Sequence, residues 1–143
     1  MSPDGDLTRL IREQIEIERQ SVERLSDTEK KVGSSAAKLL LTEMRMDSQK
    51  HASVLEAVLE VLTGGPTKPL WERALDSYVD PIILKREIEN HKTLGKSMLT
   101  HIQGEIDNTR DEAIRTLLQH LAEDEKRHDE ILSTIAEKCY KII

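Results

Sequence analysis

Cysteine is almost absent from this 143-residue sequence, in which Cys139 is the only one. A single cysteine excludes an internal disulfide and also a CxxC pair that could hold iron through its thiolates. Aromatic residues are equally scarce, with one Trp, two Tyr and no Phe. Because β-sheet proteins seldom form with so few aromatic residues, the composition favours a helical protein built on Leu, Ile, Ala and Met.

The sequence also lacks a basic stripe and any long apolar run. Its formal net charge of -6 and its pI near 5.4 argue against nucleic acid as a partner, since phosphate binding needs clustered Lys and Arg. No apolar run approaches the ~20 residues that span a bilayer, and the N-terminus has neither a basic start nor an apolar core. We therefore expect a single domain over residues 1–143, located in a reducing cytoplasm, with no nucleic-acid partner and no membrane partner.

Four stretches carry apolar residues at alternating steps of four and three, the spacing of helices that face other helices. The first runs over about 7–32, and the Gly-Ser-Ser sequence at 33–35 ends it and starts a second helix that reaches about residue 62. The third runs over about 81–103, and a capping box at 109–112 starts the fourth. About sixteen residues join the second and third helices, long enough for a crossover. The predicted fold is an all-α four-helix bundle with a long crossover between helices 2 and 3.

Polar residues interrupt each of these apolar seams. In the stretch LAEDEKRHDEIL, Glu125 and His128 occupy seam positions where leucine is expected. Burying a carboxylate and an imidazole costs several kcal/mol unless they are paired, and a metal ion suits both groups. The other seams are interrupted by Glu18, by Ser48 with His51, and by His91. We predict that five residues meet in the core as metal ligands: Glu18, His51, His91, Glu125 and His128.

A weak internal repeat relates the second and fourth helices. Asp47 precedes His51 by four residues, Asp124 precedes His128 by four, and a basic residue stands before each histidine. In this frame Ser48 takes the position of Glu125. Because Glu18 and Ser48 lie equally far from Gly33, we expect them to face each other across the first turn.

These motifs make the chain resemble the ferritin-like superfamily of di-metal carboxylate bundles, and most closely the rubrerythrin-like proteins without a rubredoxin domain. In such proteins two helices each give a glutamate and two each give Glu-x-x-His, which together hold two irons or manganese ions. The resemblance implies that Glu125 and His128 form one complete Glu-x-x-His motif, with Asp124 as the aspartate that often precedes it. It also implies that Glu18 and His51 are ligands from the first and second helices.

Two departures from the family pattern change the expected chemistry. Ser48 stands in the place of a bridging glutamate, and His91 in the place of the third-helix glutamate. The loss of two carboxylates leaves two divalent cations under-compensated, so a single metal with an open position is an alternative. Imidazole-rich sets suit zinc, iron, nickel or copper better than magnesium or calcium. Asp47 and Asp124 are further candidates, either as ligands or as acceptors that orient the histidines.

Three functions follow as alternatives, and none of them assigns a catalytic residue. The resemblance implies an oxidoreductase of the peroxidase or ferroxidase type, with one or two iron ions or manganese reacting with dioxygen or peroxide and an external electron donor. The second is a non-redox metal-binding bundle that holds zinc or a single metal. The third is a structural or interaction bundle with a degenerate site. The apolar residues Ile83 and Leu99 allow a homodimer.

Overall fold

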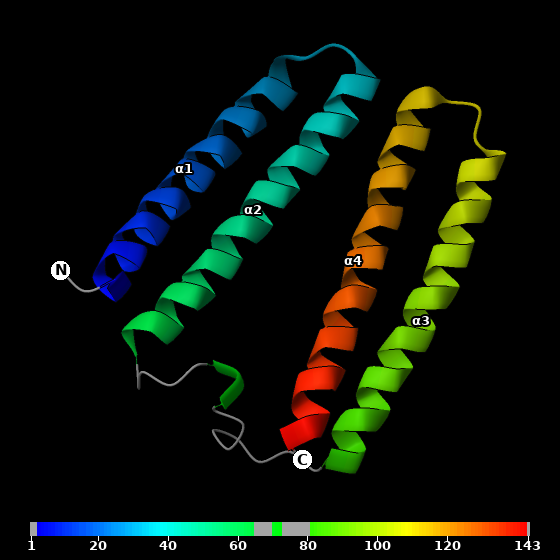
Figure 1. The fold of residues 1–143 in the computed structure, drawn as a ribbon. Helices are drawn as coiled ribbons and strands as arrows, with labels where there is room; N and C mark the ends of the chain where they lie inside the picture. Colours follow the sequence, from blue (N-terminus) through cyan, green and yellow to red (C-terminus); the bar gives the residue numbers. More distant parts are fainter. Residues whose placement is uncertain (1–2, 65–69, 73–80, 143) are drawn as a thin grey trace. The chain divides into compact units, whose positions relative to one another are not determined.

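The regular structure of this protein is entirely helical over the residues that its computed structural model describes, 3–64, 70–72 and 81–142 (Figure 1). This confirms the predicted all-α, four-helix class. Of the predicted crossover, the structure describes Gly64 and one short 3-10 helix, η1, and the rest lies outside the described residues. The elements are α1 (Pro3–Lys31), α2 (Ser35–Thr63), η1 (Leu70–Glu72), α3 (Pro81–Asn108) and α4 (Glu112–Ile142).

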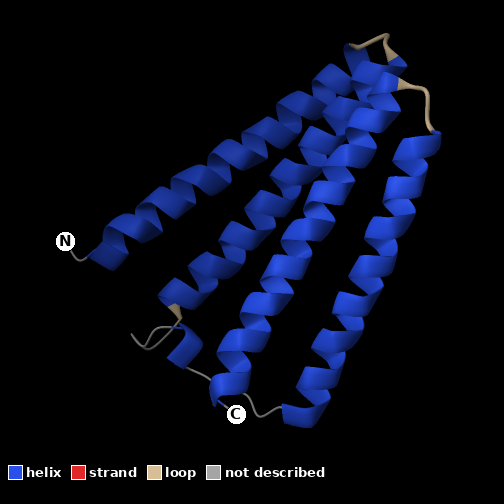
Figure 2. Ribbon diagram, turned by 45° about the vertical axis from the view of Figure 1, so that its right-hand side comes forward, coloured by secondary structure: helices blue, strands red, loops and turns tan. Residues whose placement is uncertain are grey.

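The chain divides into two compact units, residues 1–66 and 67–143. The first contains α1 packed antiparallel against α2, and the second contains α3 packed antiparallel against α4 (Figure 2). We call these pairs the first hairpin and the second hairpin. Among the described residues, no helix carries a segment long and apolar enough to cross a membrane.

The turn of the first hairpin is formed by residues 32–34 and ends at Ser34. Its hydroxyl accepts a hydrogen bond from the backbone N–H of Ala37 at 3.2 Å and so caps the start of α2. At the end of α1, the N–H of Val32 still bonds to the carbonyl of Thr28 at 3.0 Å. The non-helical residues of the turn are therefore Val32, Gly33 and Ser34, with Gly33 in the middle.

The register of the first hairpin differs from the predicted one. Ser48 lies opposite Ser21, with 3.3 Å between the two hydroxyl oxygens, and Glu18 lies opposite His51. The expectation that Glu18 faces Ser48 was wrong, because the residues that meet are spaced symmetrically about a point between Ser34 and Ser35 and not about Gly33. The true register brings together two of the predicted ligands.

The turn of the second hairpin lies later than predicted. Helix α3 continues through Gly104 to Asn108, whose side-chain amide donates to the Gly104 carbonyl at 2.7 Å. A glycine inside a helix costs about 1 kcal/mol relative to alanine, which weakens a helix without ending it. The cap of α4 is Asp111, whose carboxylate accepts a hydrogen bond from the N–H of Ile114 at 3.0 Å. The capping box predicted at 109–112 was therefore wrong.

Each hairpin has a thin apolar core made by the faces that its two helices turn toward each other. In α4 this face includes Ala122 and Glu125, whereas Leu121 is 39% exposed. The contact face of α4 therefore includes Ala122 in place of Leu121. A wide apolar stripe on a helix does not determine which side of the stripe packs against the neighbouring helix. The buried apolar side chains of the described residues are Ile11, Ile15, Ala52, Ile88, Ile102 and Ala122.

Candidate metal centre

The first hairpin brings Glu18 of α1 against His51 of α2. Their Oε1 and Nδ1 atoms lie 3.6 Å apart; the Glu18 side chain is 16% exposed and the His51 side chain 52%. Glu18 follows Ile11 and Ile15 along the seam of α1, which is why its carboxylate is held at the half-buried contact between the helices. This hairpin therefore offers one carboxylate and one imidazole to a cation.

The position of a second carboxylate in the first hairpin is occupied by a pair of hydroxyl groups. Ser48 and Ser21 are both half-buried, and their Oγ atoms lie within hydrogen-bonding distance at 3.3 Å. A pair of hydroxyls satisfies its own polar atoms and adds no negative charge. The first hairpin consequently has little capacity to balance a divalent cation.

The second hairpin groups three of the predicted ligands around one pocket. Glu125 and His128 are one turn apart on α4, with 3.5 Å between Oε1 and Nδ1, and His91 reaches the same pocket from α3. The pocket has a volume of about 450 Å³. Two imidazoles with one carboxylate form a donor set that suits iron(II) and other divalent transition metals, with coordination positions left open.

Gly95 makes space beside the Glu125 carboxylate. A Cβ atom at this position would lie 3.7 Å from Glu125 Oε2, so a longer side chain would fill the space. Two neighbouring pockets share Gly95 and Glu125 in their walls. Since glycine in a helix interior costs about 1 kcal/mol, its presence here is explained by the room that it leaves around the carboxylate.

Asp129 lines this pocket but is not among the residues that the sequence pattern predicted as ligands. It follows Glu125 by one helical turn and lines the same two pockets. Its Oδ1 atom is buried and has no hydrogen-bond partner, which is true of no other side-chain atom among the described residues. The signal that could have found it is the repeat, because Asp129 follows His128 as the buried Ala52 follows His51.

The two aspartates of the repeat lie beside the basic residues of their own helices. Asp47 Oδ1 is 3.7 Å from Lys50 Nζ, and Asp124 is paired with Arg127. Both pairs span three residues, which places their side chains on the same face of the helix. The basic residue in each frame thus has a structural explanation, and metal ligation by Asp47 or Asp124 stays a prediction.

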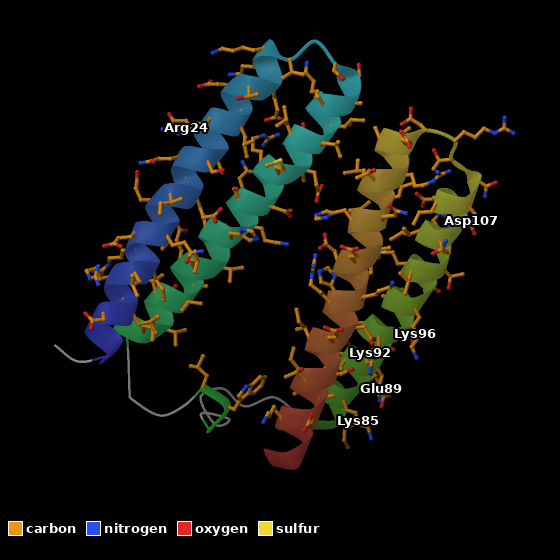
Figure 3. All side chains as sticks on the ribbon, turned by 45° about the horizontal axis from the view of Figure 1, so that its top comes forward. Arg24, Lys85, Glu89, Lys92, Lys96 and Asp107 are labelled. Carbon is orange, nitrogen blue, oxygen red and sulfur yellow. The ribbon has the colours of Figure 1, made fainter. Side chains whose placement is uncertain are left out.

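The charged side of α3 supplies one residue to the pocket of the second hairpin. Figure 3 shows Lys85, Glu89, Lys92 and Lys96 following one another along this helix. Lys92 is half-buried, lines the pocket and donates from its ammonium to the Ser133 hydroxyl at 2.9 Å. The other three residues are exposed.

A separate half-buried ion pair lies nearer the turn of the first hairpin. Arg45 Nε donates to Glu29 Oε2 at 2.7 Å, and the Thr42 hydroxyl donates to the other carboxylate oxygen. The hydrogen bond from Arg45, followed by that from Thr42, holds the pKa of Glu29 below its usual value. This carboxylate is fully partnered within the protein and is not a candidate ligand.

Comparison with known protein families matches residues 10–136 to the family described as rubrerythrin. The chain belongs to the rubrerythrin family. This confirms the predicted ferritin-like resemblance, and the matched range includes all five predicted ligands. Comparisons with curated proteins and with solved structures gave no significant match.

The donor groups of this rubrerythrin-family chain can be tested against iron, which the family typically binds. Carboxylate oxygens and imidazole nitrogens are suitable ligands for it, and each hairpin holds such a pair within 3.6 Å. The buried, unpartnered oxygen of Asp129 is a further acceptor beside Glu125. The residues therefore fit a divalent metal, although Glu18 and Glu125 supply only two negative charges against the four of two such ions.

Proposed function

We propose that this chain is a metal-binding protein that uses iron or manganese in redox chemistry with dioxygen or peroxide. The proposed ligands are Glu18, His51, His91, Glu125 and His128. The observation that supports this most directly is the pairing of a carboxylate with an imidazole in each hairpin, at 3.6 Å and 3.5 Å, on helices that are otherwise amphipathic. A bound metal would supply one-electron chemistry that the side chains lack, with electrons arriving from an external donor.

In this proposal the side chains of the protein bind the metal ion and fix its position. His51 and His128 must be neutral to donate a ring nitrogen, so metal affinity should fall as acid protonates the imidazoles. Glu18 and Glu125, each 16% exposed, hold their charge close to the imidazoles and away from bulk water. The space beside Gly95 leaves one side of Glu125 accessible to a molecule as small as peroxide.

The direct test is elemental analysis of protein purified from metal-replete cells, followed by peroxide consumption with an added reductant. We expect bound iron or manganese and peroxide-dependent oxidation in the wild-type protein, and loss of both in Glu125→Ala. The matched control is Glu123→Ala on the exposed side of α4, which should keep both. Protein that holds no metal, and that iron, manganese and zinc all fail to stabilise against heat, would overturn the proposal.

A second candidate is a non-redox site for zinc or a single metal. The hydroxyl pair of Ser48 and Ser21 favours it, because it replaces a carboxylate and leaves a set richer in imidazole. This alternative predicts stoichiometric zinc and no peroxide turnover after loading with iron. A purely structural or interaction role, the remaining alternative, predicts metal-free protein whose melting temperature a chelator does not change.

A further inference from the structure

We infer that Asp129 is a metal ligand of this chain, which gives the second hairpin a four-donor set with His91, Glu125 and His128. The inference rests on the proposed metal-binding function and deepens it, because it names an additional carboxylate and the hairpin that holds the cation more tightly. The ligand class is a divalent transition-metal ion.

One oxygen atom of the Asp129 carboxylate is buried. Its Oδ1 atom is shielded from solvent, and no donor among the described residues reaches it. A carboxylate in such a place is costly unless a cation or a set of hydrogen-bond donors compensates it. Lys92 lines the same pocket, but its ammonium is hydrogen-bonded to Ser133.

Asp129 shares its pocket with three of the predicted ligands. It lines one pocket together with His91, Glu125 and His128, so two imidazoles and two carboxylates border the same space. Four nitrogen and oxygen donors around one volume match the needs of a divalent transition metal better than those of a proton or a single hydrogen bond. The two carboxylates also neutralise the charge of one such ion.

The first hairpin differs from the second at the corresponding positions. When His128 is aligned with His51, Asp129 corresponds to Ala52, which is 8% exposed and packs as an ordinary core residue. On the facing helices, aligning His91 with Glu18 makes Gly95 correspond to Val22. The second hairpin thus has a carboxylate in place of a methyl group, and a glycine in place of a valine beside Glu125. Both changes make room for a charged centre.

The test is a titration of the metal-free full chain with Co²⁺, whose visible absorption reports the number and kind of its ligands. Asp129→Asn keeps the shape of the side chain and removes its charge; Glu123→Gln makes the same chemical change at an exposed position of α4. We expect Asp129→Asn to weaken Co²⁺ binding by about 10-fold or more and to alter the spectrum. Glu123→Gln should change neither.

Thermal unfolding adds a second measurement, in which Asp129→Asn should have opposite effects without metal and with metal. Without metal, Asp129→Asn should melt at a higher temperature than the wild type, because the uncompensated buried charge is gone. With excess Co²⁺, the gain in melting temperature should be smaller than in the wild type, since the ion binds more weakly. A carboxylate with only a structural role would give the reverse result without metal, namely a lower melting temperature.

The outcomes separate the two proposals. If Asp129→Asn binds Co²⁺ with wild-type affinity and spectrum while Glu125→Ala loses binding, the role of Asp129 is refuted and the proposed function stands. If the wild-type protein binds neither Co²⁺, Fe²⁺ nor Zn²⁺, the proposed function fails and the inference fails with it.

Discussion

The two hairpins have the same design but place their buried charge at different positions. Near the turn, the first hairpin holds the ion pair of Glu29 and Arg45, with side chains 12% and 26% exposed. When the hairpins are aligned on Glu18 with His91 and on His51 with His128, this ion pair corresponds to Ile102 and Ala122, both buried. Further from the turn, the contrast reverses. There Ser48 and Ala52 of the first hairpin correspond to Glu125 and Asp129 of the second.

This exchange supports the proposal that the second hairpin binds a cation from outside the chain. The charge in the first hairpin is compensated internally, because the guanidinium and a hydroxyl both bind the Glu29 carboxylate. In the second hairpin two carboxylates line one pocket, and no described guanidinium or ammonium is paired with either. A buried charge without a partner is far more costly than a buried pair. The comparison therefore points to the second hairpin as the stronger metal-binding half.

The largest expected effect comes from removing one carboxylate from each hairpin in turn. Glu125→Ala should weaken Fe²⁺ or Co²⁺ binding by on the order of 100-fold or more, because it removes a direct ligand from the richer donor set. Glu18→Ala should cost about 10-fold, since the first hairpin contributes less. Isothermal titration of both variants measures the difference. Equal losses would contradict the asymmetry between the hairpins.

The thin cores can be compared with one buried isoleucine in each. Ile15 and Ile88 are both 5% exposed and occupy corresponding positions, so Ile15→Ala and Ile88→Ala should each destabilise the protein by about 2–3 kcal/mol. The exposed Ile17 and Ile131 serve as controls and should change stability by less than about 0.5 kcal/mol. Chemical denaturation followed by circular dichroism measures all four.

The prediction of a single domain further requires one cooperative transition, and two separate transitions would contradict it.

The third prediction attempts to make the first hairpin resemble the second. Ser48→Glu places a carboxylate where Glu125 stands in the repeat, beside Glu18 and His51. We expect the metal stoichiometry to rise toward two, because the added charge compensates a second cation. Ser48→Gln, of equal size and no charge, is the control and should leave the stoichiometry unchanged. An unchanged stoichiometry in Ser48→Glu would argue against the alignment of the two halves.

Much of the fold was accessible from the sequence, because apolar spacing and glycine-serine turns are local signals. The seam positions of Glu18 and His51 placed both among the predicted ligands, but the residue expected opposite Glu18 was Ser48. The register was not predicted, since Gly33 is the middle residue of the turn, whereas the residues that meet are symmetric about a point between Ser34 and Ser35. Asp129 escaped because its burial depends on which edge of α4 meets α3. Periodicity alone does not specify that rotation.

The smallest expected effect concerns the ion pair of the first hairpin and its dependence on pH. The hydrogen bonds from Arg45 and Thr42 lower the pKa of Glu29 from its usual value of 4.5, so they favour the folded state when the carboxylate is ionised. This contribution is complete above pH 4.5 and is lost as the pH falls through the lowered value in the folded protein. Glu29→Gln should therefore reduce the melting temperature at neutral pH, and the difference from wild type should shrink as the pH falls below 4.5. The exposed Glu23→Gln is the control and should show no such trend. A deficit in Glu29→Gln that stays constant across this range would mean that side-chain shape, and not charge, makes Glu29 stabilising.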